Sequence, residues 1–245
     1  MGAALLLQTL AAPLGAALLS WRWPRLAYLW GALAIWLVAA LLGGFYVMPT
    51  KAWQWLPLTL LVPVIALLAT DQRSALLLFA VGGGVTWWLG LATVLASEPL
   101  IWLALLPAII WFTWCERRTD SPEGLGFALG FIWLAMVIGI DGSLLIAQLA
   151  GALAAFAGFR ALLAQFAKVQ VAPAVLGLAL AFMQMLAWQY VEVPLVVLLP
   201  VWLLPIGEWV LRHKPWLARW AVLTVLAGIG AGISLWWVWP EASLY

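Results

Sequence analysis

Apolar and polar positions divide the chain into ten long apolar stretches separated by short polar segments. Each stretch approaches the roughly 20 residues that a helix needs to cross a hydrocarbon core of about 30 Å. The apolar residues do not alternate with polar ones, for example over 33–42 and 144–159, as a membrane β-barrel would require. We therefore expect an all-α polytopic membrane bundle with short loops, whose spans cover residues 2–20, 26–48, 53–70, 74–96, 99–115, 124–140, 143–166, 171–190, 193–211 and 217–239.

The charged residues predict an orientation for this bundle. Ten of the eleven Lys and Arg residues fall on one side, in or beside the odd-numbered loops, and only Lys51 falls on the other. The first side carries a net charge of +5 (ten basic, five acidic) and the second −3 (one basic, four acidic). The positive-inside rule places the cation-rich side in the cytoplasm. This predicts that both termini lie outside, in a bacterial cytoplasmic membrane.

Composition excludes several classes of protein. Hydrophobic residues make up 67% of the 245 residues and charged residues 8%, whereas a soluble domain has about 25% charged residues. A net charge of +2 is too small for a nucleic-acid-binding surface. The single cysteine, Cys115, excludes an intramolecular disulfide framework and a cysteine-rich metal site.

The chain is expected to form a single transmembrane domain over residues 1–245. Its longest polar stretch, ERRTDSPEG at 116–124, is predicted to be a cytoplasmic loop that joins two halves, 1–116 and 124–245. Small residues in the seventh apolar stretch, GALAAFAG at 151–158, favour close helix contact and predict a central position for that helix.

Prolines inside the spans are the first candidate functional feature. An interior proline frees a backbone carbonyl and bends its helix. One interpretation is packing curvature, which membrane helices tolerate. The other is a set of hinges or broken helices around a cavity. The prolines concerned are Pro13, Pro63, Pro107, Pro200 and Pro205.

Polar side chains within the spans are few, and they form the second candidate feature. Gln148 and Gln184 lie a turn or more inside their helices, where amides usually bond across helices. Arg160 lies near the inner end of the seventh stretch and Lys168 follows it. Arg160 either extends to the headgroups or faces the bundle and, with Lys168, binds an anionic lipid, phosphate or carboxylate.

Two further side-chain types have alternative interpretations. The acids Glu98, Asp141 and Glu192 each precede a predicted helix start and are expected to cap it; the alternative is a cation-attracting mouth. Five tryptophans fall near mid-depth, where they either pack against lipid and helices or line a ligand site: Trp36, Trp87, Trp88, Trp133 and Trp202.

Enzyme signatures are not found in the sequence. The one histidine, His213, lies between Arg212 and Lys214, and no nucleophile–base pair or metal motif is evident. Glu208 and Arg212 resemble one part of the glutamate motif of membrane-embedded CAAX-type proteases, but the histidine motifs of that family are missing. The helix number is similar to that of drug/metabolite exporters, which keep both termini inside. Neither family is adopted, and we assign no catalytic residue, metal or cofactor.

Two functions remain in view. The first is a transporter or flippase for a small or lipid-linked solute, which the span number and the interior prolines favour. The alternative is a non-catalytic transmembrane subunit of a larger complex, which the short loops and the shortage of ionisable groups favour. The expected partners are membrane lipids and, in the second case, other protein subunits; nucleic acid is not expected.

Overall fold

A computed structural model describes residues 2–23, 26–67, 72–95, 106–116, 124–141, 143–167 and 173–238. Every regular element in these ranges is a helix. The elements are α1 (Gly2–Arg22), α2 (Ala27–Gly43), η2 (Ala52–Trp55), α3 (Leu56–Leu67), α4 (Gln72–Leu95), α5 (Leu106–Glu116), α6 (Leu125–Asp141), α7 (Leu144–Ala167), α8 (Pro173–Tyr190), α9 (Leu195–Leu198), η4 (Leu199–Trp202), α10 (Leu203–Val210), η5 (Leu211–His213) and α11 (Trp216–Val238).

All ten apolar stretches contain helix in the described part of the chain, because a long apolar segment in lipid must satisfy its backbone internally. Within the residues that the structure describes, three helical segments are long and apolar enough to cross a membrane: Leu144–Phe166, Leu195–His213 and Trp216–Val238. Ala27–Gly43, Ala52–Val62 and Leu125–Ile140 are shorter apolar helices. The structure thus supports an all-helical membrane protein, and the number of ten spans stays a prediction.

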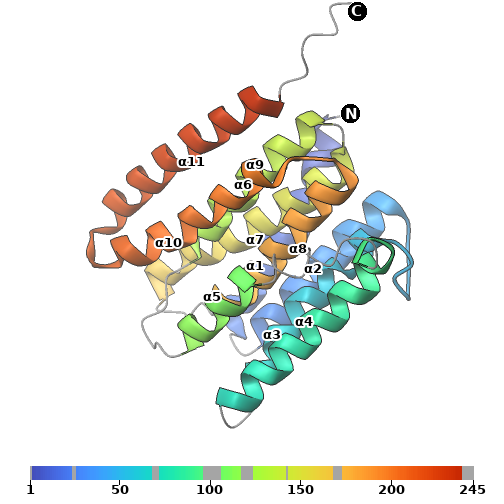
Figure 1. Cartoon of the computed structure of the whole chain (residues 1–245). Coiled ribbons are helices and arrows are strands. Elements are labelled where there is room, and N and C mark those ends of the chain that lie inside the picture. The colour runs from blue at the N-terminus through green and yellow to red at the C-terminus, as the bar shows by residue number, and fades with distance from the viewer. Residues whose placement is uncertain are drawn as a thin grey trace, which may run out of the picture.

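The helices pack side by side as a bundle (Figure 1). α11 runs along one edge of the bundle and α4 along the opposite edge, with α6, α7 and α8 between them. α7 contacts α1, α2, α6 and α8, and 61% of its most apolar window is buried, against 17% for α11. The central position predicted for the seventh helix is confirmed.

The outward surface of the bundle is apolar. On α11, the side chains of Val225, Ile229 and Ile233 are exposed, whereas Leu223, Ala227 and Ala231 are buried against the other helices. Lipid tails are as apolar as these side chains, so an outward-facing apolar surface costs nothing in a bilayer. This pattern is the one expected of a helix at the edge of a membrane bundle.

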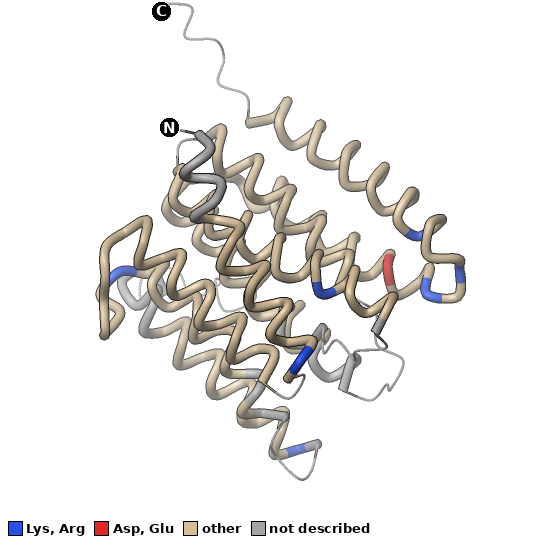
Figure 2. Tube along the Cα trace, turned by 180° about the vertical axis from the view of Figure 1, so that it is seen from behind, with Lys and Arg blue, Asp and Glu red and all other residues tan. Residues whose placement is uncertain are grey.

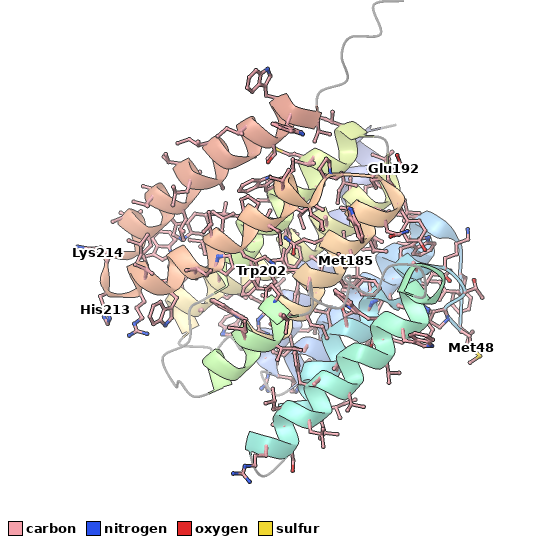
Figure 3. All side chains as sticks on the ribbon, viewed as in Figure 1. Met48, Met185, Glu192, Trp202, His213 and Lys214 are labelled. Atoms are coloured by element: carbon pink, nitrogen blue, oxygen red, sulfur yellow. The ribbon has the colours of Figure 1, made fainter. Side chains whose placement is uncertain are left out.

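The two ends of the bundle differ in charge. Figure 2 shows the described Lys and Arg positions gathered toward one end, with one position at the opposite end. Figure 3 shows His213 and Lys214 at the first end, and Glu192 and Met48 at the other. Lys51 follows Met48 by three residues, which makes it the exception that the sequence predicts. Figure 1 places the beginning of α1 and the end of α11 at the same end.

Candidate functional site

The segment Leu195–His213, called the interrupted helix below, changes its helical type after its first turn. It passes from α9 into the 3-10 helix η4 and then into α10. Pro200 is the second residue of η4 and has no N–H to donate. After the proline, the Leu203 N–H bonds to the carbonyls of Pro200 and Val201. A mid-helix 3-10 segment of this kind marks a strained or hinge-forming sequence.

A side chain from α8 crosses to this interruption. The Gln184 amide donates to the Leu198 carbonyl at 2.6 Å, and the Trp202 indole N–H donates to the Gln184 amide oxygen at 2.8 Å. All three groups are buried. We call this pair of hydrogen bonds the Gln184 bridge. The interhelical bonding that the sequence predicts for Gln184 is found, and it is made to the helix that contains Pro200.

Aromatic rings hold Trp202 in the bundle interior. Trp202 meets the Phe127 ring of α6 at a centroid distance of 6.3 Å and an interplanar angle of 84°. Phe127 in turn meets Trp111 of α5 at 5.4 Å and 80°. Figure 3 shows Trp202 and Met185 in the middle of the bundle, away from both ends. These edge-on contacts give the Trp202 ring a defined position.

A buried carboxylate on α10 caps the beginning of α6. Glu208 is 1% exposed, and its two carboxylate oxygens accept hydrogen bonds from the N–H groups of Leu125 at 3.1 Å and Gly126 at 2.7 Å. The first N–H groups of a helix have no partner within it and attract negative charge. Glu208 therefore supplies from a different helix the cap that α6 needs.

A close backbone contact between α6 and α10 brings Glu208 within hydrogen-bonding reach of the α6 N–H groups. A Cβ placed on Gly126 would lie 2.6 Å from both the Leu204 carbonyl oxygen and the Pro205 Cα. Only glycine permits such an approach, and Gly126 and Gly130 have the spacing of a small-residue helix contact. Pro205, which the sequence marks as a hinge candidate, lies at this contact.

The other proline candidates have different surroundings. The α-helix continues across Pro13 in α1 and across Pro63 in α3. Pro107 is the second residue of α5 as described, a position where the missing N–H costs nothing; residues 96–105 are outside the described ranges. Among these prolines, only Pro200 lies where the described α-helix is interrupted.

Arg160 faces the interior of the bundle. It is 3% exposed, and its guanidinium carbon lies 5.2 Å from the centre of the Tyr28 ring and 5.9 Å from that of Phe156. Tyr28 belongs to α2 and Phe156 to α7. These distances are typical of cation–π contacts. Of the two placements considered for Arg160, the structure has the one that faces the bundle.

The three polar candidates that the structure describes do not converge on one point. Gln148 and Arg160 both lie on α7, twelve residues apart, which is about 18 Å along a helix. Gln148 is partly buried, Gln184 belongs to the bridge on α8, and Lys168 lies outside the described residues. Arg160 contacts rings of α2 and α7, whereas Gln184 bonds to the interrupted helix, so the two candidates have different partners.

The structure corrects one predicted helix cap and shows another that was not predicted. Glu192 does not cap the helix that follows it, because Pro194 is the N-cap of α9 and no side chain bonds there. Conversely, sequence reasoning missed Glu208 as a cap. The visible signal was a carboxylate in the last turn of an apolar stretch, but its partners are 82 and 83 residues away.

Comparison with known proteins gives no further guide to the site. No family model, curated protein or solved structure matches the chain. Within the described ranges, no three His, Cys, Asp or Glu side chains lie together in a group that could hold a metal ion. The features that bear on function are therefore the interrupted helix, Arg160 and the charge of the two ends.

Proposed function

We propose that this chain is a multi-pass transporter or flippase of the bacterial cytoplasmic membrane, with ten spans and both termini outside. The observation that carries the proposal is the interrupted helix, whose 3-10 turn buries Val201 and Trp202 and is held by the Gln184 bridge. Transporters place discontinuous helices at mid-membrane, where their backbone binds solute or moves between two states.

The position of Arg160 supports the proposal that the transported solute carries an anionic group. Its guanidinium lies between α2 and α7 over two aromatic rings, and basic side chains between membrane helices bind phosphate-containing headgroups. A small anion and a lipid-linked phosphate share this chemistry. A carboxylate for proton coupling is not required by this mechanism, which fits a flippase or a uniporter.

A substrate-independent experiment tests the transport proposal. Alternating access opens the bundle interior to water from each side in turn, so a buried cysteine beside the bridge should react from both sides. In a Cys115→Ala chain, Met185→Cys, at a position now 1% exposed, is treated with a membrane-impermeant maleimide added outside or inside oriented vesicles. We expect slow labelling from both sides. Met136→Cys, which faces outward on α6, is the control and should not react.

Lipid transport is tested in proteoliposomes with fluorescent phosphatidylglycerol. Dithionite bleaches only the probe in the outer leaflet unless the protein moves the labelled lipid between the two leaflets. We expect the wild-type chain to make the inner probe accessible and Arg160→Gln to lose this activity at unchanged folded yield. Arg73→Gln, at an exposed position on α4, is the matched control. Normal lipid exchange by the Arg160→Gln variant would show that Arg160 has no role in transport.

Orientation is tested by labelling single cysteines at the two ends. Ser143→Cys should react from outside, and Ser121→Cys, in the loop outside the described residues, from inside. The gathering of basic residues at one end supports this orientation. The opposite labelling pattern would contradict the proposed topology.

One observation favours the alternative, a non-catalytic subunit of a membrane complex. Phe45, Val47 and Met48 are 74%, 81% and 78% exposed, and they lie after the end of α2, in non-helical chain. Exposed apolar side chains at a bundle end are typical of a docking surface. Native mass spectrometry after mild purification distinguishes the two functions, since stoichiometric protein partners indicate a subunit and a bound small molecule or lipid indicates transport.

A further inference from the structure

A depression opens at the end of the bundle away from His213 and Lys214. Its volume is about 530 Å³, and the described residues that line it come from the α6–α7 linker, the α8–α9 linker and the end of α11. Glu192, Tyr190, Trp237 and Ser143 are its polar and aromatic members. We call it the Glu192 depression. None of these residues takes part in the Gln184 bridge or the Arg160 site.

The charge of the depression favours a cation. Glu192 is the only charged side chain among the described lining residues, and it is exposed and makes no ion pair with any residue that the structure describes. Apart from Lys51, the described Lys and Arg residues gather at the other end of the bundle (Figures 2 and 3). A carboxylate in a concave surface focuses its field on a bound cation.

The rings of the depression select the kind of cation. Tyr190 and Trp237 are 53% and 66% exposed, and both line the same concavity as Glu192. Aromatic faces attract ammonium groups through the ring quadrupole, and rings combined with a carboxylate are the usual receptor for quaternary ammonium. A small hydrated metal ion gains little from such rings, so an organic ammonium is the better match.

The backbone at Glu192 has a conformation that is costly for a residue with a side chain. Its φ is +60°, and it is the only non-glycine residue with positive φ in the described chain. The turn follows the end of α8, where the N–H groups of Val191 and Val193 both bond to the Ala187 carbonyl. Glycine is the usual residue in this conformation, which costs other residues about 1–2 kcal/mol. The carboxylate therefore occupies a position that glycine would fill with less strain.

We infer that the Glu192 depression binds an organic ammonium group, with Glu192 as counter-ion and Tyr190 and Trp237 as aromatic walls. The inference does not depend on transport, because a receptor at this end of the bundle would serve a transporter and a complex subunit alike. Two sources share the chemistry: a free amine, and the ammonium headgroup of a phospholipid such as phosphatidylethanolamine.

Radiolabelled choline is the first probe, added to the full chain in detergent. We expect saturable binding that tetramethylammonium displaces and sodium does not. Glu192→Gln and Trp237→Leu should each weaken it about tenfold or more, since each removes one favourable interaction with the cation. Trp236→Leu is the matched control, because Trp236 is 83% exposed but does not line the depression, and it should bind like wild type.

Lipid is the second probe. The chain is purified from nanodiscs of equal phosphatidylethanolamine and phosphatidylglycerol, and retained lipid is measured by native mass spectrometry. Retention of phosphatidylethanolamine that Trp237→Leu loses and Trp236→Leu keeps supports the inference with a headgroup as ligand, whereas choline binding with no such retention supports a free amine.

Several results would overturn the inference. They are binding of neither probe, binding unaffected by Glu192→Gln and Trp237→Leu, and equal losses in Trp236→Leu and Trp237→Leu. The last result would make both tryptophans simple interface anchors. Glu192→Asp, which keeps the charge in a residue that tolerates positive φ, should retain binding, and this separates loss of charge from loss of fold.

Discussion

The α3 region and the interrupted helix have the same proline spacing and different structures. Pro57 and Pro63 lie in α3, which is a continuous α-helix, whereas Pro194 and Pro200 flank the change into η4. Both Pro63 and Pro200 remove one helical hydrogen bond. Proline spacing alone therefore does not determine where a helix is interrupted.

Polar groups in the two regions find partners at different distances along the chain. In the α3 region, Thr59 donates to the Leu56 carbonyl, and the Gln54 amide oxygen accepts from the N–H groups of Thr50 and Lys51. At the interrupted helix, Gln184 reaches Leu198 across helices and Glu208 reaches α6. Local bonds form with the helix itself, but distant bonds form only when the helices pack. The interruption is thus a property of the packed bundle.

The largest difference is expected from adding one methyl group to a neighbouring helix where it packs against each region. Gly126→Ala places a Cβ against backbone atoms of the interrupted helix at 2.6 Å, whereas Gly82→Ala meets a side-chain methyl of Val62 in α3 at 2.8 Å. A side chain can shift and a packed backbone cannot. We expect Gly126→Ala to lower the free energy of unfolding by about 3 kcal/mol and Gly82→Ala by about 1 kcal/mol. Reversible denaturation in mixed micelles measures both, and equal losses would contradict the comparison.

Removal of the bridge amide is expected to have the next largest effect. Gln184→Leu leaves the Leu198 carbonyl and the Trp202 indole N–H buried without their present partner, and we expect a loss of about 2 kcal/mol. Thr59→Val removes only a local bond in α3 and should cost less than about 1 kcal/mol. The same denaturation assay tests the pair. A Thr59→Val loss as large as that of Gln184→Leu would show that bonding distance does not matter.

Neutralising the distant cap is expected to have a smaller effect. Glu208→Gln keeps an acceptor for one of the two α6 N–H groups but loses the charge, and we expect a loss of about 1.5 kcal/mol. Gln54→Ala removes the local cap at the start of η2 and should cost about 0.5–1 kcal/mol. Thermal unfolding of both variants in one detergent gives the ranking. A stability of Glu208→Gln equal to wild type would show that the charge contributes nothing.

The smallest single effect is expected at the prolines themselves. Pro200→Ala restores a backbone N–H, but the Gln184 bridge still holds the turn, so the unfolding free energy should change by less than about 1 kcal/mol. In a Gln184→Leu background the same substitution should recover part of the lost stability, because the helix is then free to become regular. Pro63→Ala should not couple to Gln184→Leu. A double-mutant cycle measures these couplings, and additivity for Pro200 would separate the proline from the bridge.

The helices were predictable because their cause is local. Apolar stretches long enough for lipid must be helical, whatever their neighbours are. The small residues of 151–158 likewise predict close packing of the seventh helix, and α7 does lie among four others. Gln184 was predictable as an amide that bonds across helices, although its partner was not.

Contacts between distant residues were not predictable in this way. Glu208 and Gly126 are 82 residues apart, and nothing near either one indicates the other. The residues next to Arg160 in the sequence are compatible with both placements, extension to the headgroups and contact with Tyr28, so they do not decide between them. Glu192 precedes a helix as a capping acid would, yet the turn after α8 carries it into a depression instead.

By itself, the sequence determined that the chain is helical, apolar on its outer surface and asymmetric in charge, because these properties follow from composition, period and position along the chain. Only the tertiary structure decided which proline interrupts its helix, which polar groups are satisfied between helices, and where a carboxylate meets two aromatic rings. The physical reason is that these contacts form only when the helices pack, because they join residues that are between 14 and 83 positions apart in the chain.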